Sequence, residues 1–578
     1  MGSNTAKNLT VILLLILNTT VFAQKPLNPP VDRGPKSKIE LIRADSLVGE
    51  NLNNPLRTFY GHVRFFHRGV FLDCQKAIHN GGSNNLVAYG NILINQGDSL
   101  TITGDTLYYD GNTRLAEIHG RKVILKDGET TLESKRLDYD LNQDLAYYPR
   151  PGVIHQDSVV LSSNSGYYNT STKVFNYYGN VEILHPDFVL CTDTLDYDSN
   201  IHKAEFRTPT TIYSEDGTLK ADRGYYFTDS KKSRFFGRSY VENEEYTLEA
   251  DTLDFDTQKE EGFGQGHVIF FSKADSLYLY GDYGEKKSDQ GFTKMTGNTL
   301  MQSISDGDTL FLRAEYIIAY NSLDSVLHRN NKNDADSLNI AASDSLTTQI
   351  DSTDTALIAP DSSFTDTVRN TDPNKIQFLI ADGDVKIFRK DFQAVCDSLN
   401  YNLVDSVITF IVNPMIWSSE NQLEGDTILV LMKKNKINTM FLRQKSFVIA
   451  LDSVENFNQI KGREIVAYFD KDTNIDRVLV DGNGESIYFA MNEQNQVIGL
   501  NRVECSKMSL GFKERKVKRI LFMGNPESKL IPPVEINTGD MKLDGFDWKM
   551  DQKPTKEEVV GSKFVRDIAV DNEPNREP

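Results

Sequence analysis

The sequence lacks the features that mark many enzymes and helical membrane proteins. Its 9 histidines include no H-E-x-x-H pair, and it has neither a G-x-S-x-G nucleophile elbow nor a P-loop. Beyond the N-terminus no apolar run is long enough to cross a bilayer, and helix formers at a spacing of 3.6 are almost absent. We therefore expect an all-β protein that is not an enzyme and needs no cofactor.

Positive charge is scarce relative to negative charge. The chain has 63 Lys and Arg residues against 82 Asp and Glu residues, a formal net charge of −19. This excess argues against nucleic acid as a partner and against docking onto an anionic membrane surface. Any lipid partner must then be held mainly by its apolar part.

Cysteine is also rare, with 4 in 578 residues. Cys74, Cys396 and Cys505 each come just before the same repeated motif, where other copies carry a small residue such as Gly104 or Ala250. Distant copies in a stacked array lie too far apart for a disulfide, so we expect buried free thiols. Disulfides remain the alternative, because four cysteines in an exported chain permit them.

The N-terminus has the pattern of a cleavable export signal. Lys7 precedes an apolar run over 9–17, and Val21-Phe22-Ala23 forms a small-residue cleavage site. We expect a signal peptide over 1–23, cleaved after Ala23, and a periplasmic mature chain associated with the cell envelope. An uncleaved anchor helix is the alternative.

One motif recurs along the chain. Gly104–Asp110 (GDTLYYD) reappears as Thr192–Asp198 (TDTLDYD) and as Ala250–Asp256 (ADTLDFD), with weaker copies between them. Copies of this Asp-Leu motif begin at 105, 135, 165, 193, 222, 251 and 282. The period is about 29 residues, which indicates a repeat-built protein.

A second motif falls between these copies. This Gly-Val motif predicts short strands, each entered through a glycine, at Gly61–Phe65, Gly90–Ile94, Gly179–Ile183, Gly266–Phe270 and Gly383–Ile387. In the Asp-Leu motif Leu195 and Tyr197 alternate with Asp196 and Asp198, the pattern of a sheet with one buried face. One unit cannot bury its own apolar face, so the copies must stack.

The same reading divides the chain into segments. They are a signal peptide (1–23), a linker (24–38), a first β-repeat array (39–320), a disordered insertion rich in Asp, Ser and Thr (321–375), a second array (376–532) and a polar C-terminal tail (533–578), loose from about Asp551.

These two alternating motifs after a signal peptide resemble the OstA-like proteins, which share the fold of the periplasmic lipopolysaccharide carrier LptA. Gln459–Gly462 and Gly482–Phe489 are similar to a long version of the family. The resemblance implies an elongated β-jellyroll with an open apolar trough that shields lipid A acyl chains of lipopolysaccharide on the way to the outer membrane. It also implies end-to-end strand pairing with LptC-like and LptD-like jellyroll domains, or head-to-tail self-association. The chain departs from LptA in being much longer.

Apolar positions of both motifs are the candidates for lipid contact on the interior face, with plain core packing as the alternative for each. They are Leu107, Tyr109, Leu137, Tyr139, Val181, Ile183, Leu195, Tyr197, Leu253, Phe255, Val268 and Phe270.

Paired carboxylates such as Asp196/Asp198 and Asp254/Asp256 suggest calcium, but the calcium-binding nonapeptide repeat is absent, so we expect no metal site. Two other functions stay open. One is an envelope scaffold without lipid cargo, and the other is a carbohydrate-active enzyme, which would need carboxylates clustered in a cleft.

Overall fold

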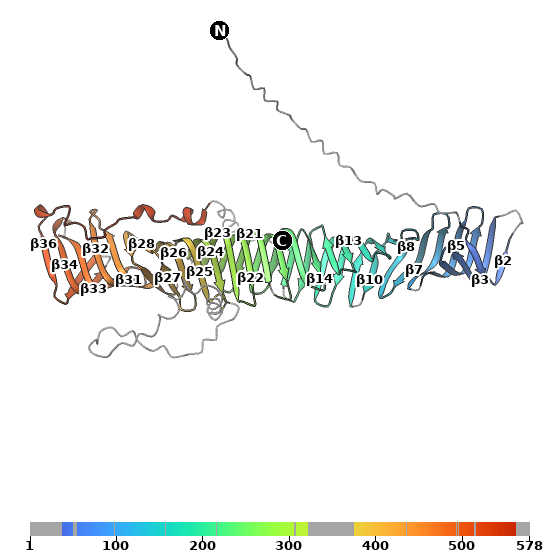
Figure 1. The fold of residues 1–578 in the computed structure, drawn as a ribbon, viewed down its shortest axis with the longest axis horizontal. Coiled ribbons are helices and arrows are strands. Elements are labelled where there is room, and N and C mark those ends of the chain that lie inside the picture. The colour runs from blue at the N-terminus through green and yellow to red at the C-terminus, as the bar shows by residue number, and fades with distance from the viewer. Residues whose placement is uncertain are drawn as a thin grey trace, which may run out of the picture. The chain divides into compact units, whose positions relative to one another are not determined.

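The computed structural model describes residues 37–49, 55–97, 99–156, 158–215, 217–259, 261–305, 308–321, 375–434, 436–492, 494, 496–513 and 516–561. These residues form 36 strands, two short 3-10 helices and a helical turn over 556–561, which confirms the all-β fold class (Figure 1). None of their helices is long and apolar enough to cross a membrane. The proposed signal peptide lies outside the described residues.

The chain divides into two compact units, residues 1–118 and 119–578. The strands of the first unit are β1 (Glu40–Arg43), β2 (Ser46–Val48), β3 (Leu56–His67), β4 (Val70–Asn80), β5 (Asn85–Gln96) and β6 (Leu100–Asp110). Strand β7 (Leu115–Asp127) contains the division.

The strands of the second unit are β8 (Thr130–Asp140), β9 (Leu145–Tyr148), β10 (Gly152–Gln156), β11 (Val159–Ser163), β12 (Ser165–Asn169), β13 (Val174–Leu184), β14 (Phe188–Asp198), β15 (Lys203–Phe206), β16 (Thr210–Ser214), β17 (Gly217–Ala221), β18 (Arg223–Phe227), β19 (Lys232–Glu242), β20 (Tyr246–Asp256), β21 (Glu261–Ser272), β22 (Leu277–Lys287), β23 (Phe292–Ser305), β24 (Asp308–Tyr320), β25 (Phe378–Phe388), β26 (Gln393–Asn402), β27 (Val407–Ile411), β28 (Met415–Ser418), β29 (Asn421–Glu424), β30 (Thr427–Lys433), β31 (Lys436–Leu451), β32 (Phe457–Phe469), β33 (Ile475–Met491), β34 (Val497–Lys513), β35 (Lys516–Met523) and β36 (Glu527–Ile531).

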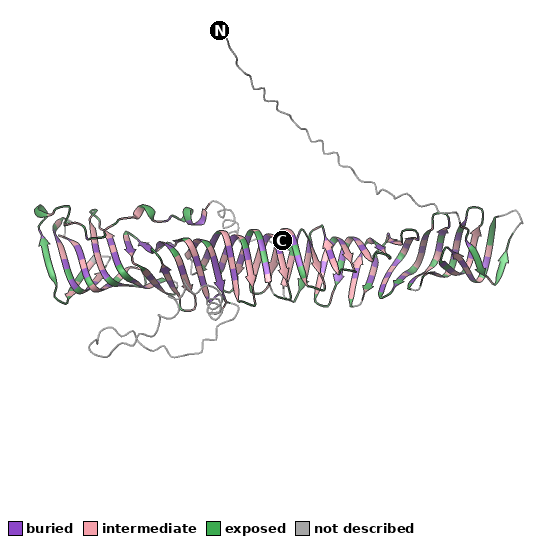
Figure 2. Ribbon diagram, viewed as in Figure 1, coloured by how far each residue is buried: buried purple, intermediate pink, exposed green. Residues whose placement is uncertain are grey.

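Neighbouring strands pair antiparallel, and most follow one another in sequence, as β20, β21 and β22 do. In several copies a pair of short strands replaces one long strand. Strand β14, for example, pairs with both β15 and β16. Buried and exposed residues alternate along the strands (Figure 2), as expected for a sheet with one buried face.

The Gly-Val motif marks a corner inside a strand, and the expectation that its glycine starts a short strand is wrong. Gly266 lies within β21, and both Gly266 and His267 have positive φ, at 78° and 45°. The pairing with β22 shifts register between Gln265 and Val268. A Cβ on Gly266 would lie 2.5 Å from Asp251 Oδ2, so the corner requires glycine for both its conformation and its space.

The aspartate of the Asp-Leu motif holds the corner of the following strand. Asp251 Oδ2 lies 2.7 Å from His267 Nδ1, and Asn298 Nδ2 donates to Asp282 Oδ2 at 2.6 Å. The two sequence motifs are therefore two sides of one structural feature on adjacent strands.

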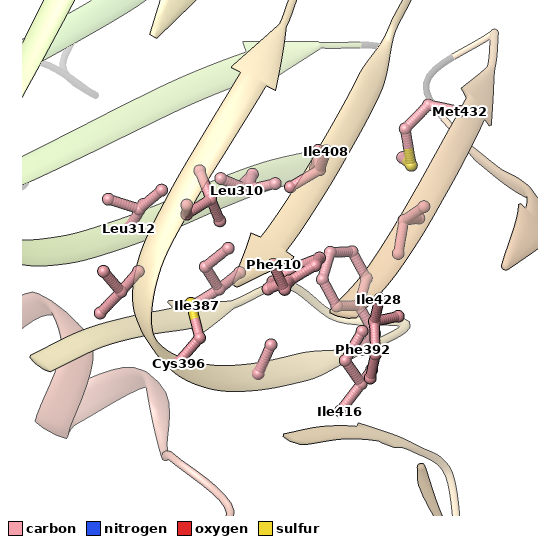
Figure 3. Close-up of a cluster of buried hydrophobic side chains, with 14 of the residues drawn as sticks. Leu310, Leu312, Ile387, Phe392, Cys396, Ile408, Phe410, Ile416, Ile428 and Met432 are labelled. Carbon is pink, nitrogen blue, oxygen red and sulfur yellow. The ribbon is translucent and has the colours of Figure 1, made fainter. Parts of the chain in front are cut away.

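The corners fold each long strand into two arms that share one core. In β25, Leu379 and Ala381 precede the corner while Val385 and Ile387 follow it, and all four belong to one buried cluster. Figure 3 shows this cluster around Phe410 and Cys396. Two arms with facing apolar surfaces bury one core between them, as packed layers of sheet do.

The expectation of buried free thiols is confirmed for Cys74, Cys396 and Cys505, which are buried and unbonded. Burial raises the pKa of the Cys74 and Cys396 thiols to about 12. Both thiols therefore remain protonated at neutral pH.

The two predicted arrays are joined directly. Strand β24 pairs with β25, with Tyr320 opposite Phe378, although 57 residues separate the two in sequence (378 minus 321). The insertion itself lies outside the described residues except at Asn321 and Lys375.

The expectation of a loose C-terminus from Asp551 is wrong for the described part. After β36 the chain forms η1 (Pro533–Glu535), η2 (Met550–Gln552) and a helical turn over 556–561. This strap, residues 533–561, runs back along the sheet toward β24 (Figure 1). Apolar side chains in it, such as Leu543 and Val559, are buried, which composition alone did not reveal.

Three long polar side chains on the sheet hold the main chain of the strap. Gln459 donates to the Met541 carbonyl at 2.7 Å and accepts from the Leu543 N–H at 2.8 Å. Gln422 likewise donates to the Asp547 carbonyl and accepts from the Lys549 N–H. Arg313 donates to the carbonyls of Val559 and Val560.

Candidate functional site

The C-terminal part of the second unit encloses a large cavity between the two arms. Its volume is about 2240 Å³. Its apolar lining comes from several strands, namely Val448, Ile460, Phe469, Met508, Leu510, Phe512, Ile520 and Phe522. We call this cavity the trough.

Alternation on β31 shows which face is the trough. Val448 and Ala450 line the cavity, whereas their neighbours Phe447 and Ile449 pack with Leu543 of the strap in a separate apolar cluster. The strap thus covers the outer face of this arm, and Met550 and 553–557 of the strap reach the edge of the cavity. The apolar outer face is buried without filling the trough.

Hairpin turns form the two edges of the trough. One edge includes the turns near Lys434 and Lys471, and the other includes those near Lys390, Ser419 and Asp452.

The buried guanidinium of Arg389 forms ion pairs with Asp308 at 3.2 Å and with Asp391 at 3.0 Å, joining β24 to a turn of the second edge. Burial raises the pKa of Asp391, an effect that Arg389 opposes.

The twelve predicted lipid-contact residues are placed as follows. Ten are buried, whereas Tyr197 and Phe255 are half-buried. Val268 and Phe270 belong to the same buried cluster as Leu312 and Phe410. Burial of this kind fits core packing as well as an interior lipid surface, so their role in lipid contact stays a prediction.

None of the twelve lines the trough; Phe255 lines a smaller cavity of about 530 Å³. The apolar lining residues named above all belong to the second array, where the sequence predicts only a continuation of the repeat. The alternation of Met508, Leu510 and Phe512 with Ser509 and Gly511 was the signal that marked this inner face.

The paired aspartates lie beside nitrogen donors. Asn176 Nδ2 donates to Asp196 at 2.7 Å, and Arg234 makes two bonds to Asp254, at 2.6 and 2.8 Å. These carboxylates form cross-strand pairs on the outer face.

Two-armed antiparallel strands around an apolar interior define a protein of the β-jellyroll type. Residues 36–193 and 185–251 match the family of OstA-like proteins, in agreement with the resemblance that the motifs indicated. Residues 376–532 lie beyond the match.

Among solved structures, the chain is similar to LptH from Pseudomonas aeruginosa, described as the LptA-homologous periplasmic component of the lipopolysaccharide transport device. The identity is 14%, the match covers 20% of this chain and 94% of that chain, and the TM-score is 0.19. No curated protein matches the chain.

Proposed function

We propose that this protein is a periplasmic bridge component that shields the acyl chains of lipopolysaccharide on their way to the outer membrane. The trough is the observation that carries the proposal. Its volume of about 2240 Å³ exceeds the roughly 300–1,000 Å³ typical of small-molecule sites. A cavity of this size, with apolar side chains on part of its lining, suits a ligand with several acyl chains, and the OstA-like match supports the same class of ligand.

The proposal includes partners at the two ends of the array. Strands β1 and β2 are exposed and carry large apolar side chains, among them Ile42 and Val48. Exposed edge strands add main-chain hydrogen bonds to a neighbouring sheet. LptC-like and LptD-like jellyroll domains, or a second copy of this chain, are the proposed neighbours. The proposal assigns the protein no catalytic step.

The test is purification of the protein from an envelope that contains lipopolysaccharide, followed by mass spectrometry for bound lipid A. Leu510→Asp places a charge in the trough and should abolish co-purification. Ser509→Asp, on the opposite face of β34, is the matched control and should retain it.

Circular dichroism must show that both variants keep the β-fold. Retention of lipid A by a folded Leu510→Asp protein would contradict the proposal. A wild-type protein that carries no lipid would favour the alternative of an envelope scaffold.

A further inference from the structure

The edges of the trough reverse the charge balance of the whole chain. Nine Lys and Arg residues line the cavity against six Asp and Glu residues, whereas the chain has 63 basic and 82 acidic residues. An acidic protein has thus gathered cations around the trough. The overall composition, which is acidic, does not explain this local excess of basic residues.

Five of these cations gather along one edge of the trough, which we call the lysine rim. They are Lys433, Lys434, Lys436, Lys471 and Lys518. All five are exposed, and within the described part of the chain none belongs to an ion pair. Lys436 Nζ donates to the carbonyl of Lys471 at 3.1 Å, so the turns after β30 and β32 are in contact.

Two of the carboxylates that line the cavity, Asp470 and Asp452, are hydrogen-bonded within their own turns. The Asp470 carboxylate accepts the N–H groups of Asp472 and Asn474, each at 2.9 Å. The Asn474 hydrogen bond is the largest cause that lowers the pKa of Asp470. On the opposite edge, Asp452 accepts from Val454 and Asn456 in the same way. Both carboxylates stabilise turns and form no ion pair with a rim lysine, although the charge of Lys471 also lowers the pKa of Asp470.

We propose that the lysine rim binds the phosphate groups of the lipid whose acyl chains occupy the trough. This inference rests on the proposed function and adds a headgroup site to it. The apolar lining adjoins the rim in the same cavity. Phe469 ends β32 just before Lys471, and Ile520 lies on β35 with Lys518. Apolar chains below and anions above would match both surfaces at once.

The test removes charge from the rim without touching the apolar lining. The rim variant is K433Q/K434Q/K471Q/K518Q. A matched control removes the same number of positive charges from exposed lysines that do not line the trough, as K126Q/K220Q/K259Q/K529Q. Both are made in the full chain, and circular dichroism and thermal unfolding confirm that each is folded.

Equilibrium binding is measured with diphosphoryl lipid A, with the same lipid A after enzymatic dephosphorylation, and with phosphatidylglycerol. Wild type and control should bind diphosphoryl lipid A at least about tenfold more tightly than the dephosphorylated form, because exposed charge pairs add up over several contacts. The rim variant should lose this preference and keep its affinity for the dephosphorylated form. About 1 M salt should remove the preference from wild type.

Equal affinity of wild type for the two forms of lipid A would contradict phosphate binding by the lysine rim and leave the proposed function standing. So would a folded rim variant that weakens both forms equally. Failure of wild type to bind either form would overturn the proposed function as well. Tight, salt-sensitive binding of phosphatidylglycerol would support the rim as a general site for lipid phosphates, and weak binding would support specificity for phosphorylated glycolipids.

Discussion

At the scale of single residues, alternation along a strand decides which substitutions the protein tolerates. Leu195 is 1% exposed, whereas the neighbouring Asp196 is partly exposed and lies 3.2 Å from Arg207. Leu195→Asp should therefore destabilise the second unit by several kcal/mol and weaken lipid capture, because an unpaired charge enters the interior. Asp196→Asn should cost less than about 1 kcal/mol, as for an exposed ion pair.

Chemical denaturation of both variants and a lipid-binding measurement check this prediction. Similar effects of the two substitutions would mean that the inward and outward assignment of the strand is wrong.

One buried and one half-buried histidine should make the first unit sensitive to pH. His67 is 1% exposed and lies 2.6 Å from the Tyr109 hydroxyl, and burial lowers the pKa of both His67 and His79. A folded-state pKa below the unfolded value of about 6.5 means that the unfolded state binds more protons. The free energy of unfolding should be highest above pH 6.5 and fall as the pH drops below it.

Thermal unfolding across pH 5 to 8 tests this, with H67Q/H79Q as the comparison. The double variant should show a flatter pH profile. An unchanged slope would assign the pH dependence to other groups.

At the scale of elements, the join between the arrays predicts that the insertion is dispensable for folding. Tyr320 and Phe378 are already paired, and Gln377 N–H donates to the Tyr320 carbonyl at 2.8 Å. Replacing 322–374 by a four-residue Gly/Ser linker should leave thermal unfolding nearly unchanged, because the composition of this segment cannot build a core. A drop of many degrees would show that the insertion packs against the sheet.

The strap predicts a different result for the C-terminus. Gln459 is fully buried and satisfies two main-chain groups of the strap, which would lose their partners in Gln459→Ala. The cost should be about 2–4 kcal/mol. Gln258→Ala, at an exposed turn, is the control. Limited proteolysis should then cleave the strap in Gln459→Ala first, and equal protease resistance in the two variants would contradict this anchoring role.

At the scale of the whole molecule, the repeat predicts a rod. About 440 residues at a period near 29 give roughly fifteen units, and about two strands per unit at about 4.8 Å give a length on the order of 140 Å. Small-angle scattering should give a maximum dimension of this order. Photo-crosslinks to partners should come from the end repeats, near residues 39–80 and 487–522, and a globular profile or crosslinks confined to the middle would contradict the bridge.

The amino-acid sequence by itself determined the all-β fold class, the buried alternating positions and the free thiols. Each of these depends on local pattern, since a strand alternates its side chains and turns need particular residues. It also marked the OstA-like family through two recurring motifs, although it did not show that Asp251 and Gly266 meet at one corner.

Tertiary structure alone decided the rest. The composition of the strap is that of a polar tail because its few apolar residues are widely spaced, and Leu543 is buried by a cluster of strand residues that includes Phe447 and Ile449. The trough depends on the distance between the two arms. The lysine rim depends on contact between turns that are nearly 40 residues apart in sequence, at Lys434 and Lys471. Such contacts between distant segments follow from register and corner geometry, which no local pattern encodes.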